Sequence, residues 1–167
     1  MWIRDRSEGD IAEHYKTEVE DVYAFVKQVG IEGCYCFGFD AGGLVAMMLA
    51  EQYPTIFKKM IVAGVFVNGG GIRPYHYLTE GFHRFLKLDR DSRVELTESF
   101  ISVDDLKKIK TPTLCVVGEK DWVKVEHVRW YSQFMPNARL VIMPRQTHNS
   151  YAVRSLKLLD LIKGFCR

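Results

Sequence analysis

The segment Gly38-Phe39-Asp40-Ala41-Gly42-Gly43 contains the first candidate for chemistry. It lies between two apolar blocks, and small residues at 38 and 42 would let the backbone turn sharply and expose residue 40. A helix that starts behind such a turn carries free amide groups, which stabilise an ionised Asp40. Two interpretations stay open for this segment alone. Asp40 is a nucleophile, or it caps a helix while the glycines serve packing.

Asp121 and His148 are the two partners that such a nucleophile would need. Asp121 follows an apolar block at 112–117, and His148 follows another at 139–143. In open parallel sheets ligands bind at the carboxyl ends of the strands, so Asp40, Asp121 and His148 would converge on one crevice. The order nucleophile, acid, histidine also matches a known order for catalytic triads. A turn aspartate and a surface histidine are the alternatives, and we predict the triad.

The elements that must position these residues are short buried strands alternating with helices. We predict strands at residues 33–37, 59–67, 112–117 and 139–143. Helical spacing of apolar residues predicts four helices: from a capping box at Thr17 to Gly30, from 44 to 49 before Tyr53-Pro54, around Val125 and Val128, and along the stripe Val153, Leu156, Leu159 and Ile162. This alternation predicts an α/β fold with a mostly parallel sheet and helices on both faces.

Residues 68–109 interrupt the alternation between two predicted strands. The stretch begins Asn-Gly-Gly-Gly and contains several aromatic residues, and we interpret it as a small helical insertion, or lid. Its last piece is predicted to be a short helix, because Ser102 is a good N-cap and acidic residues follow it. We expect Tyr75 and Tyr77 of this insertion to contact a substrate.

Length and composition exclude several classes of protein. A chain of 167 residues with 47% hydrophobic residues predicts one domain over residues 1–167. With 23 basic and 21 acidic residues and no basic run, we expect no nucleic-acid partner. No apolar run is long enough for a membrane span and the first residues lack a signal-peptide pattern, so we expect a cytoplasmic protein. The histidine and cysteine spacings predict no metal site, and no organic cofactor is implied.

Three segments together resemble the α/β-hydrolase superfamily, in particular its single-domain, esterase-like members. They are Tyr35 to Gly43, Thr111 to Asp121 and Pro136 to His148, and the likeness is to the later part of that fold. The resemblance implies a hydrolase with Asp40, Asp121 and His148 as its triad. It also implies the Ala41 backbone amide as an oxyanion donor, and a substrate pocket that includes Phe39 and Trp122.

The aspartate at the elbow departs from the serine that most members carry. The resemblance implies that members with aspartate are haloalkane and fluoroacetate dehalogenases and epoxide hydrolases, whose carboxylate attacks a saturated carbon and whose histidine activates water. Dehalogenases usually follow this aspartate with tryptophan, where this chain has Ala41. The sequence therefore predicts a hydrolase for a small apolar substrate. The alternative is a non-catalytic relative that serves as a binding or interaction module.

No counterpart of the family's first strands and His-Gly loop precedes the elbow. The resemblance therefore implies that the strand at 33–37 becomes an exposed, apolar edge. Such an edge can pair with another strand, so we expect a homodimer through residues 33–37 or another polypeptide that covers them.

Overall fold

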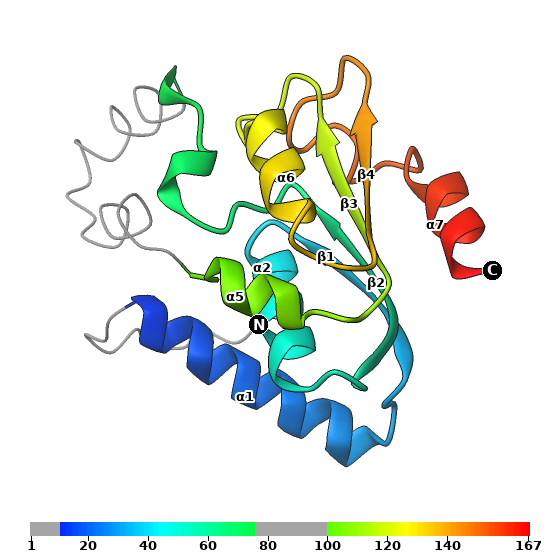
Figure 1. Cartoon of the computed structure of the whole chain (residues 1–167). Coiled ribbons are helices and arrows are strands. Elements are labelled where there is room, and N and C mark those ends of the chain that lie inside the picture. The colour runs from blue at the N-terminus through cyan, green and yellow to red at the C-terminus, as the bar shows by residue number, and fades with distance from the viewer. Residues whose placement is uncertain (1–10, 76–99) are drawn as a thin grey trace.

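The computed structural model describes residues 11–75 and 100–167 (Figure 1). Within these residues a sheet of four parallel strands forms the centre, in the spatial order β1-β2-β3-β4. The strands are β1 (Cys34–Phe39), β2 (Phe57–Ala63), β3 (Thr113–Gly118) and β4 (Ala138–Met143). The parallel α/β architecture predicted from the sequence is confirmed.

The register of the strands aligns their carboxyl ends at one edge of the sheet. Phe39 at the end of β1 lies opposite Ala63 at the end of β2. Gly118 at the end of β3 lies opposite Met143 at the end of β4. The residues that directly follow β1, β3 and β4 are therefore brought to the same side of the molecule.

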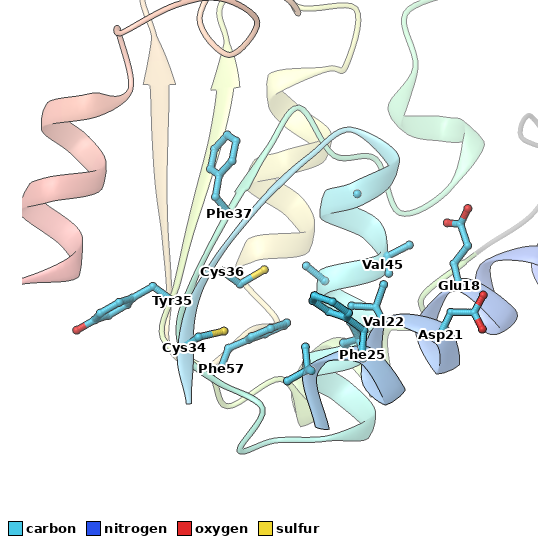
Figure 2. A pocket seen from close by; sticks show the side chains of 14 residues that line it. Glu18, Asp21, Val22, Phe25, Cys34, Tyr35, Cys36, Phe37, Val45 and Phe57 are labelled. Atoms are coloured by element: carbon cyan, nitrogen blue, oxygen red, sulfur yellow. The ribbon is translucent and has the colours of Figure 1, made fainter. Parts of the chain in front are cut away.

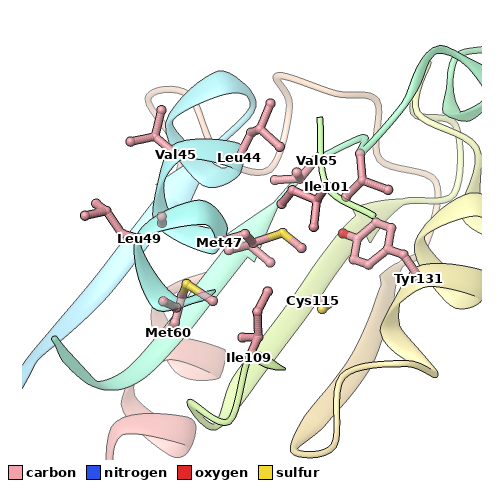
Figure 3. Close-up of a cluster of buried hydrophobic side chains, with 14 of the residues drawn as sticks. Leu44, Val45, Met47, Leu49, Met60, Val65, Ile101, Ile109, Cys115 and Tyr131 are labelled. Carbon is pink, nitrogen blue, oxygen red and sulfur yellow. The ribbon is translucent and has the colours of Figure 1, made fainter. Parts of the chain in front are cut away.

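Helices cover both faces of this sheet, as predicted (Figure 1). One face carries α1 (Ile11–Val29), α2 (Ala41–Gln52), α5 (Val103–Lys108) and α6 (Val125–Ser132), and the opposite face carries α7 (Leu159–Cys166). Helix α2 is apolar on nearly all sides, and its Leu44 and Met47 pack with Met60 of β2 in the larger core (Figure 3). A smaller core on the α7 side includes Leu114 and Tyr151.

Two predicted elements are shorter in the structure than in the sequence analysis. Strand β2 ends at Ala63 because Gly64 adopts a φ of 62°, which is outside extended geometry. The predicted C-terminal helix is wrong in its first half. Val153 and Leu156 lie in a non-helical segment before α7 and are 49% and 80% exposed, so they form no buried stripe.

The predicted insertion at 68–109 is described only at its two ends, and residues 76–99 lie outside the described part of the chain. Both ends pack into the body of the domain. Ile72 is buried and forms a bridge with Val123, and Leu106 of α5 is fully buried. The predicted cap of α5 is confirmed, because Ser102 Oγ accepts a hydrogen bond from the Asp105 amide at 3.2 Å and forms a capping box with it.

Strand β1 lies at one edge of the described sheet, beside a groove of about 650 Å³ (Figure 2). The groove is lined by side chains of α1, α2 and β1, and most of them are apolar. Tyr35 and Phe37 of β1 are 46% and 45% exposed. The pairing of two chains through residues 33–37 stays a prediction. In the described part of the chain no helix is long and apolar enough to cross a membrane.

Candidate active site

Asp40 stands at the sharp turn between β1 and α2, where its φ is 53° and its ψ is −126°. Its amide donates to the Ala63 carbonyl at 2.9 Å, which ties the turn to β2. A positive φ in a residue other than glycine costs on the order of 1–3 kcal/mol and is typical of functional sites. Asp40 occupies the N-cap position of α2, but its side chain makes no capping hydrogen bond. The carboxylate is thus not used to cap the helix.

The turn depends on a close approach between Gly38 and Gly43. A Cβ at Gly38 would lie 2.6 Å from the Gly43 Cα, and a Cβ at Gly43 would collide with the Val65 side chain. At Gly42, in contrast, an added Cβ meets nothing within 4 Å. The predicted need for a small residue is therefore confirmed at Gly38 and wrong at Gly42, because the second position that needs glycine is 43.

His148 lies between the carboxylates of Asp121 and Asp40. Its Nδ1 is 2.8 Å from Asp121 Oδ1, and its Nε2 is 3.9 Å from Asp40 Oδ1. The side chains of Asp121 and His148 are 0% and 8% exposed, whereas that of Asp40 is 41% exposed. The Nε2 atom is buried and has no hydrogen-bond partner among the described residues. The structure thus brings together the three residues predicted from the sequence, with an imidazole nitrogen facing the exposed carboxylate.

The two carboxylates decide the charge of His148. Burial alone would lower the pKa of this imidazole, but the hydrogen bond with Asp121 and the nearby Asp40 carboxylate outweigh it and raise the pKa to about 9. His148 is therefore protonated at neutral pH in the free protein. It can act as a base only after one of these influences is weakened.

Asp121 is held by more donors than the sequence predicts. Its Oδ1 accepts from the Val123 amide at 3.0 Å, and its Oδ2 accepts from the Tyr151 hydroxyl at 2.9 Å. Tyr151 was not predicted, because it lies 30 residues from Asp121 and just before the stripe that predicted the C-terminal helix. The one feature of the sequence that could have indicated Tyr151 is an aromatic residue three positions after His148.

Aromatic rings flank the imidazole of His148. The ring centroids of Phe39 and Trp122 lie 4.7 Å and 4.3 Å from that of His148. Phe66, which the sequence analysis did not single out, lies 5.6 Å from Trp122. Aromatic side chains thus surround part of the site formed by Asp40, Asp121 and His148.

The structure gives less detail on the remaining predicted site residues, Ala41, Tyr75 and Tyr77. Ala41 is the first residue of α2, directly after Asp40. Tyr75 is 50% exposed at the end of a described segment, and Tyr77 lies outside the described residues. In the described ranges no group of three or more His, Cys, Asp or Glu side chains could hold a metal ion.

Comparisons with known proteins agree with this fold. The family model described as "Serine hydrolase (FSH1)" matches residues 1–149. Serine hydrolase BPHL of Mus musculus is 24% identical over 176 residues, which cover 90% of this chain and 60% of that protein. Epoxide hydrolase 4 of Mus musculus is 26% identical over 118 residues, which cover 65% of this chain and 32% of that protein. The chain thus spans less than two thirds of both curated relatives.

Solved structures of similar fold are α/β-hydrolases. MGS-M2, an α/β-hydrolase enzyme from a Medee basin deep-sea metagenome library, has a TM-score of 0.68 at 24% identity, covering 89% of this chain and 70% of that one. The 2-hydroxy-6-oxo-6-phenylhexa-2,4-dienoate hydrolase of Rhodococcus sp. strain RHA1 has a TM-score of 0.75 at 16% identity, covering 98% and 74%. At these identities the likeness establishes the fold.

Proposed function

The chain belongs to the serine hydrolase (FSH1) family, and from this premise we propose that it is a hydrolase whose nucleophile is the carboxylate of Asp40 instead of a serine. The observation that carries the proposal is the position of His148, whose unpartnered Nε2 lies 3.9 Å from Asp40 Oδ1. A gap of this length is too long for a direct hydrogen bond. An imidazole there can activate a water beside an ester formed on Asp40.

The first step is an attack by an Asp40 oxygen on a saturated carbon of the substrate. A new bond between that oxygen and the carbon forms as the bond from the carbon to the leaving atom breaks, and the leaving atom takes the electron pair. An epoxide oxygen that leaves in this way then takes a proton from water and becomes a hydroxyl group. Asp40 then carries a neutral ester. An attack on an ordinary ester substrate would produce a reactive anhydride instead, which disfavours the usual esterase reaction.

The second step is hydrolysis of that ester. His148 Nε2 removes a proton from water, and the resulting hydroxide attacks the carbonyl carbon of the Asp40 ester. The Ala41 amide at the start of α2 would stabilise the oxyanion of the tetrahedral intermediate. As the intermediate collapses, the departing oxygen takes the proton from the His148 imidazolium and leaves as an alcohol, and the new carboxyl group loses its proton to solvent, which restores the carboxylate. Asp121 keeps the imidazole oriented and stabilises its protonated form through the 2.8 Å contact at Nδ1.

An epoxide is the substrate class that this site favours. When an epoxide opens, the leaving oxygen stays attached to the substrate, so the site does not have to bind a separate leaving group. A departing halide would need hydrogen-bond donors, and Ala41 stands where dehalogenases usually have a tryptophan. The similarity to epoxide hydrolase 4 supports the same class. Phe39 and Trp122, whose rings lie beside that of His148, would contact a small apolar substituent. Tyr75 and Tyr77 are proposed to donate hydrogen bonds to the opening ring.

Intact-protein mass spectrometry tests this function. The wild-type chain and its Asp40→Asn and His148→Gln variants are incubated with a panel of epoxides and alkyl halides. We expect His148→Gln to gain the mass of one epoxide, because its ester forms and cannot be hydrolysed, and Asp40→Asn to gain none. Equal labelling of both variants, or none in either, would contradict the proposal, and the absence of labelling would favour the binding-module alternative.

A further inference from the structure

The Asp121 carboxylate is fully buried, and each of its oxygens has a separate set of donors. Oδ1 receives His148 Nδ1 at 2.8 Å and the Val123 amide at 3.0 Å. Oδ2 receives the Tyr151 hydroxyl at 2.9 Å, while the Gly118 amide is 3.4 Å away. Among the described residues, Tyr151 is therefore the close donor to the oxygen that His148 does not use.

Two glycines make room for this contact. A Cβ on Gly64, directly after β2, would lie 2.9 Å from His148 Nδ1 and 3.0 Å from the Tyr151 hydroxyl. A Cβ on Gly118, at the end of β3, would lie 3.1 Å from the Tyr151 ring. The side chains of Tyr151 and His148 thus both pack against Gly64, and the Tyr151 side chain is fully buried. Its position is determined by packing on two strand ends.

We propose that Tyr151 is a positioning residue, whose hydroxyl holds Asp121 Oδ2 and so keeps Oδ1 directed at Nδ1 of His148. A carboxylate can rotate about its bond to Cβ, and a buried one turns toward whatever donors are available. With Tyr151 in place, both oxygens are satisfied in a single orientation. The catalytic consequence rests on the proposed function, but the positioning itself requires no substrate.

The hydroxyl of Tyr151 remains a donor over the useful pH range. Burial and the negative charge of Asp121 raise its pKa well above the usual value, so it keeps its proton. If the hydroxyl is removed, Oδ2 loses its close partner in a buried site and the carboxylate turns to find another. Its hold on the imidazolium of His148 then weakens. The pKa of His148 should consequently fall toward its ordinary value.

The test compares Tyr151→Phe with wild type by NMR of the ¹⁵N-labelled chain without substrate. Tyr151→Phe keeps the whole ring and removes one oxygen, so the fold is retained, and circular dichroism checks this. We expect the pKa of His148 to fall by about one unit, a tenfold loss of proton affinity, and the Nδ1 proton to exchange faster with water. Tyr131→Phe is the matched control. Tyr131 is equally buried and its hydroxyl has no hydrogen-bond partner in the described residues.

A Tyr151→Phe protein with the wild-type pKa and exchange rate at His148 would overturn the proposal, as would an equal change in Tyr131→Phe. The result is separate from that of the adduct experiment. A lowered pKa with no epoxide adduct supports Tyr151 as a positioning residue and refutes the proposed function. An adduct with an unchanged His148 pKa supports the proposed function and refutes Tyr151 as a positioning residue. When both hold, Tyr151→Phe should also retain part of the adduct, because an imidazole that Asp121 no longer holds in one orientation activates water more slowly.

Discussion

His148 Nε2 lies 3.9 Å from Asp40 Oδ1, while the other nitrogen of the same ring lies 2.8 Å from Asp121. One carboxylate is thus in direct contact with the imidazole, and the other faces it across a gap. This asymmetry supports the proposed roles, in which Asp121 orients the imidazole and Asp40 reacts with the substrate. It also means that the charge on Asp40 influences the pKa of His148, the base that would act on the Asp40 ester.

Replacing Asp40 by asparagine should lower the pKa of His148, because one of the two negative charges that favour the imidazolium is removed. We expect a fall of about one unit, measured by NMR titration of the imidazole. An ester on Asp40 is neutral in the same way, so the first step would itself prepare His148 to act as a base. Glu119→Gln serves as the control, since Glu119 lies at the same sheet edge without contacting His148. An unchanged pKa in Asp40→Asn would contradict this coupling.

The contribution of His148 to stability should decline in alkaline solution. Its pKa in the folded protein, about 9, exceeds its ordinary value of 6.5. A raised folded-state pKa stabilises the protein fully below the unfolded value, and this stabilisation is lost as the pH rises through the folded value. The difference in Tm between wild type and His148→Gln should therefore shrink from pH 6.5 to above pH 9.

His127→Gln provides the control for that experiment. His127 is buried, and burial lowers its pKa to about 4, so it is neutral throughout this range. Its Nε2 accepts a hydrogen bond from the Val67 amide at 3.1 Å. His127→Gln should lower Tm by a similar amount at each pH. A constant difference for His148→Gln as well would show that its pKa is not raised.

The elbow glycines should respond differently to alanine. Gly43→Ala forces a methyl group against Val65 and should destabilise the chain by about 1–3 kcal/mol. Gly42→Ala is the matched change one position earlier, where space is open, and it should stabilise the chain by about 0.5 kcal/mol through the lower backbone entropy cost. Urea unfolding measures both. Equal effects at the two positions would mean that the close approach at Gly43 is not maintained in solution.

The apolar edge at β1 predicts a dimer that a charge would disrupt. Phe37→Lys places a cation on the exposed edge strand and should shift the chain toward monomer in light scattering. Leu156→Lys changes an even more exposed residue outside β1, in the segment before α7, and should leave the dimer intact. A monomeric wild-type chain at working concentrations would contradict the pairing.

The sequence predicted the parts of this molecule that depend on local pattern. Strand and helix order followed from apolar blocks, and the positions of Asp121 and His148 followed from strand ends. The contact of Tyr151 with Asp121 joins residues 30 positions apart through side chains, and no periodicity reports such a contact. The stripe of Val153 and Leu156 had helical spacing, yet this segment forms turns that carry Tyr151 into the smaller core. Tertiary packing outweighed local preference there.

The most direct test of the account follows oxygen from water into Asp40. The wild-type chain is allowed to turn over an epoxide in H₂¹⁸O and is then digested with trypsin in ordinary water. The mass of peptide 28–58, which contains Asp40, is measured by mass spectrometry. Because the Asp40 ester is hydrolysed at its carbonyl carbon, repeated turnover should place ¹⁸O in this peptide, and His148→Gln should leave it unlabelled. Product that contains ¹⁸O from the first turnover, with an unlabelled peptide, would show that water attacks the substrate directly and that Asp40 is not the nucleophile.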